Sequence, residues 1–207
     1  MVVPENVKAR LDVSRETIER LEKLAELLEK WNPKINLVSK STIADLWNRH
    51  ILDSTQLFKM SPDIAGHWLD IGSGGGFPGL VVAILNTEKK RPWQVTMIES
   101  DIRKCTFLRT VLRETGVSAE VITKRIESAE PQNADVLSAR ALADLDKLNG
   151  FAEIHLKTTG VALFPKGNQW KKELEFAQKS WKFNHEAINS ETQEGSVILK
   201  IEGITRV

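Results

Sequence analysis

Residues 67–82 read HWLDIGSGGGFPGLVV, and this stretch decides the fold. A short apolar run ends at Asp70, five glycines follow within residues 72–79, and a second apolar run begins at Leu80. Glycine allows a positive φ and lets a ligand lie directly against the main chain. The free N–H groups of a helix start add a weakly positive end. We therefore predict a buried strand, a glycine loop and a helix, the junction where nucleotide-like ligands bind in open α/β sheets.

The glycine loop is compatible with two ligands. Gly74, Gly76 and Gly79 match the dinucleotide fingerprint G-x-G-x-x-G, which leaves a nicotinamide-dependent oxidoreductase open. Pro78 lies inside that segment, however, and removes an N–H donor that a pyrophosphate needs. The residues from Asp70 to Gly76 also follow D-x-G-x-G-x-G, which resembles motif I of class I S-adenosylmethionine-dependent methyltransferases. The Asp70 carboxylate can then face the amino group of the methionine moiety, and this second interpretation is favoured.

The next apolar stretch, residues 94–99, is a predicted strand that ends in an acid. Glu99 follows Gly76 by 23 residues, and a carboxylate there can accept hydrogen bonds from two ribose hydroxyls. Both candidate ligands carry such a ribose, so Glu99 does not separate them. The same carboxylate can instead cap a helix that begins near Asp101.

Length and composition bound the class of protein. A chain of 207 residues is one large domain, or one domain with a helical extension. A single cysteine excludes a disulfide framework and fits a reducing cytosol. No apolar run reaches the roughly 18 residues of a membrane span, and the N-terminus lacks the pattern of a secretory leader. The net charge of +1 does not mark an obvious polyanion binder. We expect a cytoplasmic monomer without a membrane partner.

Periodicity divides the chain into a helical part and an alternating part. Residues 14–31 are a predicted amphipathic helix that Ser14 caps and Pro33 ends, and a second helix is predicted from Ser41 or Thr42 to about residue 59. From residue 67 the chain alternates, with predicted strands at 67–71, 94–99, 119–124, 134–139 and 160–165 and helices at 77–86, 101–115, 141–153 and 169–180. Such alternation implies parallel strands with right-handed crossovers.

The C-terminal part breaks the alternation. Residues 183–188 and 196–201 are joined by a polar stretch and predict an antiparallel pair at the sheet edge. The expected α/β fold, a mostly parallel sheet with a C-terminal antiparallel hairpin, resembles the Rossmann-like fold of class I methyltransferases. We expect residues 1–62 to form an N-terminal helical extension packed on the core, and residues 63–207 to form a domain similar to that of class I methyltransferases.

Several blocks of sequence resemble the RsmG (GidB) family of bacterial small-subunit ribosomal RNA guanine-N7 methyltransferases. Their joint order and spacing, from about residue 27 onward, carry the resemblance, and the Phe77-Pro78-Gly79 ending of the loop is its most distinctive part. The blocks are Lys30–Asn32 with Ile35–Leu37, Arg49–Ser54, Leu69–Gly79, Glu99–Ser100 with Arg103–Lys104, Phe107–Arg109, Arg125–Glu127, Ser138–Ala141 and Lys166–Gly167.

The resemblance implies S-adenosyl-L-methionine as cofactor and 16S ribosomal RNA, free or in the small-subunit particle, as substrate. Its site residues fall on matching positions of this chain. Gly72, Gly74 and Phe77 are expected to line the cofactor, Glu99 to hold the ribose, Ile126 and Glu127 to lie beside the adenine, and Arg140 to face the point where methyl donor and base meet.

The chemistry of guanine N7 sets what the enzyme must supply. The N7 lone pair lies in the ring plane and needs no deprotonation, so positioning and charge matter more than a general base. Arg140 is the expected positioning residue, since its planar fork fits guanine O6 or a phosphate; a structural ion pair is the other interpretation. Cys105 lies within a predicted helix, and His50 on an apolar helix face, so neither is expected to be catalytic. No spacing predicts a metal site.

Local basic residues are the expected RNA contacts. Arg49 and Lys166 are the two main candidates, within a wider set of Lys34, Lys40, Arg103, Lys104, Arg109, Arg113, Lys171 and Lys172. Three other functions stay open from the sequence. They are a nicotinamide-dependent oxidoreductase, a non-catalytic RNA-binding or ribosome-assembly module, and methyl transfer to a small molecule or protein.

Overall fold

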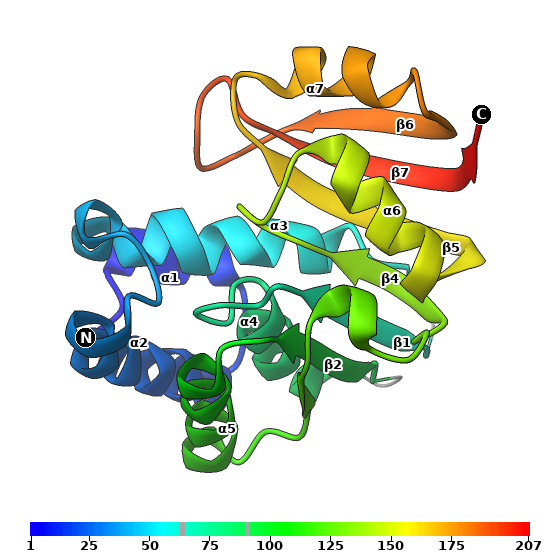
Figure 1. Ribbon diagram of the computed structural model, residues 1–207. Coiled ribbons are helices and arrows are strands. Elements are labelled where there is room, and N and C mark those ends of the chain that lie inside the picture. The colour runs from blue at the N-terminus through cyan, green and yellow to red at the C-terminus, as the bar shows by residue number, and fades with distance from the viewer. Residues whose placement is uncertain (63–64, 90–91) are drawn as a thin grey trace.

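The computed structural model describes residues 1–62, 65–89 and 92–207 (Figure 1). Within these ranges seven strands form one sheet in the order β3-β2-β1-β4-β5-β7-β6. The strands are β1 (His67–Ile71), β2 (Gln94–Glu99), β3 (Glu120–Thr123), β4 (Ala134–Ser138), β5 (Leu156–Lys166), β6 (Trp181–Asn189) and β7 (Val197–Arg206). The predicted mostly parallel sheet is confirmed, although β5, β6 and β7 are longer than expected.

Strand direction and order fix where a ligand can bind at the edge of the sheet. β3, β2, β1, β4 and β5 are parallel neighbours, whereas β7 is antiparallel to both β5 and β6. The C-terminal hairpin is therefore confirmed as well. The chain runs outward from β1 in one direction to β3 and then returns to β4 on its other side. Loops that leave β1 and β4 consequently diverge at the carboxyl edge and open a crevice there.

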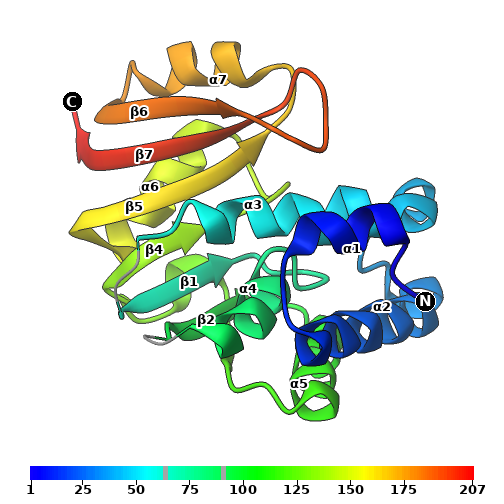
Figure 2. The same cartoon turned by 180° about the vertical axis from the view of Figure 1, so that it is seen from behind.

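Helices cover both faces of the sheet. Figures 1 and 2 show α6 on one face and the N-terminal helices with α4 on the other. The helices are α1 (Glu5–Leu11), α2 (Arg15–Ile35), α3 (Asp53–Lys59), α4 (Gly79–Leu85), α5 (Ile102–Thr115), α6 (Leu145–His155) and α7 (Trp170–Ala177). Shorter turns are η1 (Lys40–Asp45), η2 (Trp47–Leu52), η3 (Asn86–Glu88) and η4 (Ile126–Ser128).

The N-terminal helices share one hydrophobic core with α4 and α5. Leu21, Leu24 and Leu28 on α2 are fully buried in it. Each such leucine contributes roughly 1.5–3 kcal/mol on burial. Trp31 at the end of α2 lies against Phe107 of α5, with the ring centroids 5.9 Å apart. The expected domain boundary between residues 62 and 63 touches residues 63–64, which lie outside the described residues.

The prediction that Pro33 ends the helix of residues 14–31 is wrong. α2 continues through it to Ile35, and Asn36 ends the helix with φ 48° while its N–H donates to the Asn32 carbonyl at 3.0 Å. Proline removes one backbone N–H but does not prevent a last turn that tertiary packing stabilises. Asn32 is buried, and its Oδ1 accepts from the Val38 N–H at 2.9 Å, which ties the helix end to the next segment.

Three further local differences matter for the site. The helix predicted from residue 41 or 42 to 59 is instead η1, η2 and α3 in succession, with η2 a π-helix. α1 was not predicted. α6 begins at Leu145 rather than 141, because Ala141 has φ 52° and the Asp144 carboxylate caps the helix by accepting from the Lys147 N–H at 2.9 Å. Residues 141–144 therefore stay outside the helix, at the carboxyl edge of the sheet.

Candidate functional site

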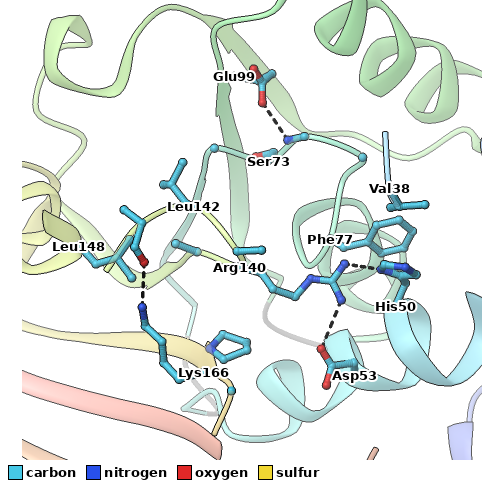
Figure 3. A pocket seen from close by; sticks show the side chains of 18 of the residues that line it. Val38, His50, Asp53, Ser73, Phe77, Glu99, Arg140, Leu142, Leu148 and Lys166 are labelled. Carbon is cyan, nitrogen blue, oxygen red and sulfur yellow. Dashed lines mark hydrogen bonds and ion pairs between the residues drawn. The ribbon is translucent and has the colours of Figure 1, made fainter. Parts of the chain in front are cut away.

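A cavity of about 820 Å³ opens at the carboxyl edge of the parallel strands (Figure 3). Its size falls in the range of small-molecule sites. Loops that follow β1, β2, β3, β4 and β5 line it, together with parts of residues 37–53 and the loop between β6 and β7. The sequence predicted this edge of the sheet, but it did not indicate that residues 37–53 and 190–198 close the cavity.

Main-chain atoms of the glycine loop form one side of the cavity. The Gly72 N–H donates to the Ile98 carbonyl at 2.8 Å, which fixes the loop to β2. Gly72 has φ +63°, and a Cβ there would lie 2.5 Å from Cδ1 of Leu142. Gly74 also has a positive φ, +54°. Glycine is needed at both positions because other residues adopt this conformation only under strain.

The expectation that Asp70 faces the ligand is wrong. Its side chain is buried beneath the loop, where Oδ2 accepts from the Gly79 N–H at 3.2 Å and Oδ1 accepts from the Ser138 hydroxyl at 2.8 Å. Burial raises the pKa of Asp70 to about 6, against the opposing effect of these hydrogen bonds. Asp70 therefore joins the start of α4 to β4 and does not line the cavity.

Glu99 lies at the end of β2 and lines the cavity. Its Oε2 accepts from the Gly74 N–H at 2.9 Å, and its Oε1 accepts from the Asp101 N–H at 2.8 Å. The cap of α5 is Asp101 itself, whose carboxylate accepts from the Arg103 N–H at 2.8 Å. Each Glu99 oxygen keeps a second lone pair. We call residues 72–75 together with Glu99 the glycine wall.

Ile126 and Glu127 also line the cavity, in η4 directly after β3. Ile126 is buried, and its carbonyl accepts from Nε2 of His155 at 2.9 Å. Glu127 is exposed. The two residues that the sequence placed beside an adenine are thus brought to the same cavity as the glycine wall.

Arg140 is held at the other side of the cavity by four groups. It follows β4, and its Nη1 donates to the Arg49 carbonyl at 2.8 Å and to Oδ2 of Asp53 at 3.3 Å. Its Nη2 donates to Nδ1 of His50, and its guanidinium carbon lies 5.3 Å from the centre of the Phe77 ring. Figure 3 shows these side chains converging on Arg140. We call Arg140, His50, Asp53 and Phe77 the arginine wall.

His50 is a neutral partner of Arg140. Burial lowers the pKa of His50 to about 3, and the nearby cations Arg140 and Arg49 add to this. Since Nδ1 accepts from Arg140, the proton is on Nε2, which donates to the Thr42 hydroxyl at 2.8 Å. The ring lies against Phe77, with centroids 5.0 Å apart. The expected buried, hydrogen-bonded histidine is present, yet its place in the site was not predicted.

Asp53 and Thr42 are site residues that sequence reasoning missed. Asp53 lies in the block Arg49–Ser54, which carries part of the resemblance but predicts no role for this residue. A π-helix precedes it, and the wider turn sets which of these side chains face the cavity. No periodicity in the sequence marks such a turn. The signal that could have pointed to Asp53 is the cluster of polar residues in the block Arg49–Ser54 itself.

Four of the ten basic residues expected to bind RNA are engaged by side-chain hydrogen bonds or ion pairs within the protein. Lys166 is buried, and its Nζ donates to the Ala143 carbonyl at 2.8 Å and to Oε2 of Glu173 at 2.6 Å. Arg103 pairs with Asp101, Arg109 with Thr123 and the Val121 carbonyl, and Arg113 with Glu114. The sequence could not reveal these pairings, since most of them join different elements.

Five other cations line the cavity without an ion pair among the described residues. They are Arg49, Lys104, Lys124, Arg125 and Lys147. We call this set the basic rim. Lys147 lies 5.6 Å from the ring centre of Phe151. Two of the five, Arg49 and Lys104, were expected from the sequence.

Cys105, the candidate nucleophile, does not line the cavity. Cys105 is fully buried, and its Sγ donates to the Glu99 carbonyl at 3.2 Å. Across the described ranges, no group of three or more His, Cys, Asp or Glu side chains is placed to hold a metal ion. No helix in residues 1–62, 65–89 or 92–207 is long and apolar enough to span a membrane.

Comparison with known proteins gives one consistent family. The family model described as rRNA small subunit methyltransferase G matches residues 17–197. The Ribosomal RNA small subunit methyltransferase G of Ruegeria sp. (strain TM1040) is 61% identical over 95% of this chain and 96% of its own length. The protein of the same name from Ruegeria pomeroyi is 55% identical over the whole of both chains.

Solved structures agree on the fold. A TehB-like SAM-dependent methyltransferase from Corynebacterium glutamicum has a TM-score of 0.57 at 14% identity, over 90% of this chain and all of that one. TYW2 of M. jannaschii, solved in complex with AdoMet, has a TM-score of 0.57 at 15% identity, over 84% and 80% of the two chains. At such identities these neighbours show a shared architecture and nothing finer.

Proposed function

This chain belongs to the rRNA small subunit methyltransferase G family, and we propose that it transfers a methyl group from S-adenosylmethionine to N7 of a guanine in 16S ribosomal RNA. It is an S-adenosylmethionine-dependent methyltransferase, and the family finding replaces the nicotinamide-dependent alternative. One observation carries the finer proposal: a single cavity has a glycine wall suited to a cofactor on one side and a fixed cation on the other.

The glycine wall fits S-adenosylmethionine. A Cβ at Gly72 would overlap Leu142, so this position keeps a bare main chain at the cavity. We propose that Gly72, Gly74 and Phe77 hold the methionine end, while Glu99 accepts from the ribose hydroxyls. Ile126 and Glu127 would flank the adenine. When bound, the cofactor supplies a methyl group on a positively charged sulfur.

The arginine wall is suited to positioning a base rather than to moving a proton. His50 is neutral, and its Nδ1 is already occupied by Arg140, so it is not free to act as a general base there. Guanine N7 needs none. A guanidinium has five N–H donors, and Arg49, Asp53 and His50 take three of them. We propose that a remaining donor of Arg140 binds guanine O6 and aligns N7 with the methyl group.

The basic rim supplies the RNA contacts in this proposal. Its five cations are free of internal ion pairs within the described residues and surround the cavity. Phosphate contacts of this kind position a nucleic acid without reading its sequence. Arg49 stays a proposed RNA contact. Lys166 does not, because Glu173 and Ala143 hold its ammonium, and we assign it to shaping the loop that follows β4.

The remaining expectations complete the proposal. We propose that the enzyme acts in the cytoplasm as a monomer and without a metal ion. Its substrate is the 16S RNA alone or in the small-subunit particle. Residues 1–62 act as a helical extension of a methyltransferase domain at 63–207, and this extension contributes His50 and Asp53 to the site.

Chemical and mass mapping of ribosomal RNA tests the function directly. 16S RNA from cells that lack this protein should miss one N7-methylguanine, which borohydride and aniline cleavage and nuclease-digest masses both detect. Purified protein with S-adenosylmethionine should restore that mark on naked RNA or on small-subunit particles from those cells. An unchanged methylation map in the deleted strain, or a mark restored on another atom or molecule, would contradict the proposal.

A further inference from the structure

The loop between β6 and β7 reaches away from the sheet to α3, and both views of the chain show this (Figures 1 and 2). The loop comprises Ser190 to Ser196, and both of these residues line the cavity. Its attachment to α3 is polar. The Glu191 N–H donates to Oε1 of Gln56 at 2.7 Å, and Gln56 itself is buried.

Thr192 connects this loop to the arginine wall. Its hydroxyl donates to Oδ1 of Asp53 at 2.7 Å, and Oδ2 of the same carboxylate accepts from Arg140 at 3.3 Å. The direction of each bond is fixed, because a carboxylate can only accept and the guanidinium can only donate. The Asp53 and Arg140 side chains are each 16% exposed, so water competes little for these bonds. Thr192, Asp53 and Arg140 thus form one hydrogen-bonded chain.

Without the Thr192 hydroxyl, Oδ1 of Asp53 would keep only a longer contact, from Nε2 of Gln56 at 3.3 Å. The carboxylate would then be free to rotate about its last bond. Because Asp53 is the ionic partner of Arg140, such rotation would loosen the guanidinium above Phe77. A misplacement of about 1 Å at a reacting centre is enough to slow turnover by orders of magnitude.

We propose that Thr192 is a positioning residue for methyl transfer, acting on Arg140 through Asp53. The inference rests on the proposed function of the same site and adds a part of the chain that does not touch Arg140. It gives the loop between β6 and β7 a role in alignment, whereas a purely structural role would confine the loop to stabilising the fold.

A matched control separates the two roles. Arg10 of α1 holds the same loop from outside the site, through the Glu191 carbonyl at 3.4 Å and the Glu191 carboxylate at 3.6 Å. It has no contact with Asp53 among the described residues. Arg10→Gln therefore loosens the loop without altering the chain to Arg140, whereas Thr192→Val removes the hydroxyl with nearly the same volume. Thr192→Ser keeps the hydroxyl.

The experiment measures turnover on 16S RNA, cofactor affinity by calorimetry, and the Nε–H signal of Arg140 in 15N-labelled protein. Thr192→Val should lower kcat about tenfold, the value of one modest charge-assisted hydrogen bond, with cofactor affinity unchanged within about twofold. It should also broaden the Arg140 signal. Thr192→Ser and Arg10→Gln should retain wild-type kcat and signal. In an Asp53→Asn background, Thr192→Val should broaden the Arg140 signal no further.

Wild-type kcat with an unchanged Arg140 signal in Thr192→Val would overturn the inference. An equal loss in Arg10→Gln would also overturn it, since loop attachment alone would then explain the effect. Failure of the proposed function looks different. The wild-type protein would then leave 16S RNA unmethylated, while the Arg140 signal would still report whether Thr192 is coupled to it.

Discussion

The two walls of the cavity are built in different ways. The glycine wall comes from two neighbouring strands and their loops, and main-chain bonds such as Gly72 N–H to the Ile98 carbonyl hold it in place. The arginine wall joins residue 140 to residues 50, 53 and 77 through side chains. The first wall is therefore set by local backbone conformation, and the second by packing of three separate parts of the chain.

This difference predicts different failures. A side chain added in the glycine wall strains the backbone or blocks the cofactor, so it should lower the affinity for the cofactor. A change in the arginine wall leaves a buried polar group without its partner, which is costly when the group is charged. Such a change should act on turnover. Variants in each wall can therefore show whether the two are separable.

The largest expected effect is that of Arg140→Ala. Loss of a charged donor at the reacting base should lower kcat by about 100-fold, which corresponds to about 2.7 kcal/mol. Cofactor affinity, measured by calorimetry, should change far less. Arg140→Lys serves as the control, because it keeps the charge but cannot reproduce the fork that contacts Asp53 and His50. Wild-type turnover in Arg140→Ala would remove the arginine wall from the reaction.

Gly72→Ala should act on the other wall. The positive φ costs an alanine roughly 1 kcal/mol, and the new Cβ would press on Leu142. We expect S-adenosylmethionine to bind about tenfold more weakly, with kcat at saturating cofactor much less affected. Gly150→Ala is the matched control. Gly150 lies within α6, and a Cβ there would meet only Trp181, at an ordinary contact distance of 3.7 Å. Equal effects of Gly72→Ala on affinity and on kcat would mean that the walls are not separable.

The free energy of unfolding below pH 6.5 should show whether His50 is neutral in the folded protein. Its folded pKa of about 3 lies below the ordinary histidine pKa of 6.5, so the unfolded chain binds more protons between these values. The neutral histidine therefore contributes stability above pH 6.5 that is lost as the pH falls. Between pH 6.5 and 5.5 the wild type should lose about 1 kcal/mol more than His50→Gln in urea unfolding.

The pH dependence of stability that Asp70 contributes has the opposite sign to that of His50 between pH 3.8 and 6. Asp70 has a folded pKa of about 6, raised above 3.8, so its contribution is present at low pH and is lost as the pH rises through 6. Asp70→Asn therefore provides the comparison for His50→Gln. Parallel pH profiles for the wild type and His50→Gln would show that burial does not hold His50 neutral.

The smallest expected effect concerns the basic rim. Lys124→Gln should reduce the salt slope of RNA binding by about one, measured by filter binding across a range of salt concentrations. Arg15→Gln, on the exposed pair with Glu19 of α2, should leave the slope unchanged. The wild-type slope should correspond to only a few phosphates. A slope equivalent to about ten phosphates would show that RNA binding extends well beyond the cavity.

Sequence reasoning succeeded where structure depends on neighbouring residues. The loop of residues 72–79, the strand that ends at Glu99 and the terminal hairpin follow from glycine spacing, apolar runs and alternation. It failed at Asp70, which it assigned to a ligand, and it did not reveal the internal partners of Lys166. Both belong to internal contacts, with Ser138 and Gly79 in one case and Glu173 in the other. Such partners are 7 to 68 residues away in the chain, so no local pattern identifies them.

The chain by itself determined the sheet, the glycine wall and the family, because each depends on short-range backbone preferences or on an ordered set of motifs. Only the tertiary structure decided what stands opposite that wall. Arg140 becomes a fixed cation because residues of η2 and α3 hold its guanidinium, and the loop of residues 190–196 packs against α3. Burial then holds His50 neutral. Charge state and side-chain direction depend on surroundings that form only when distant segments pack.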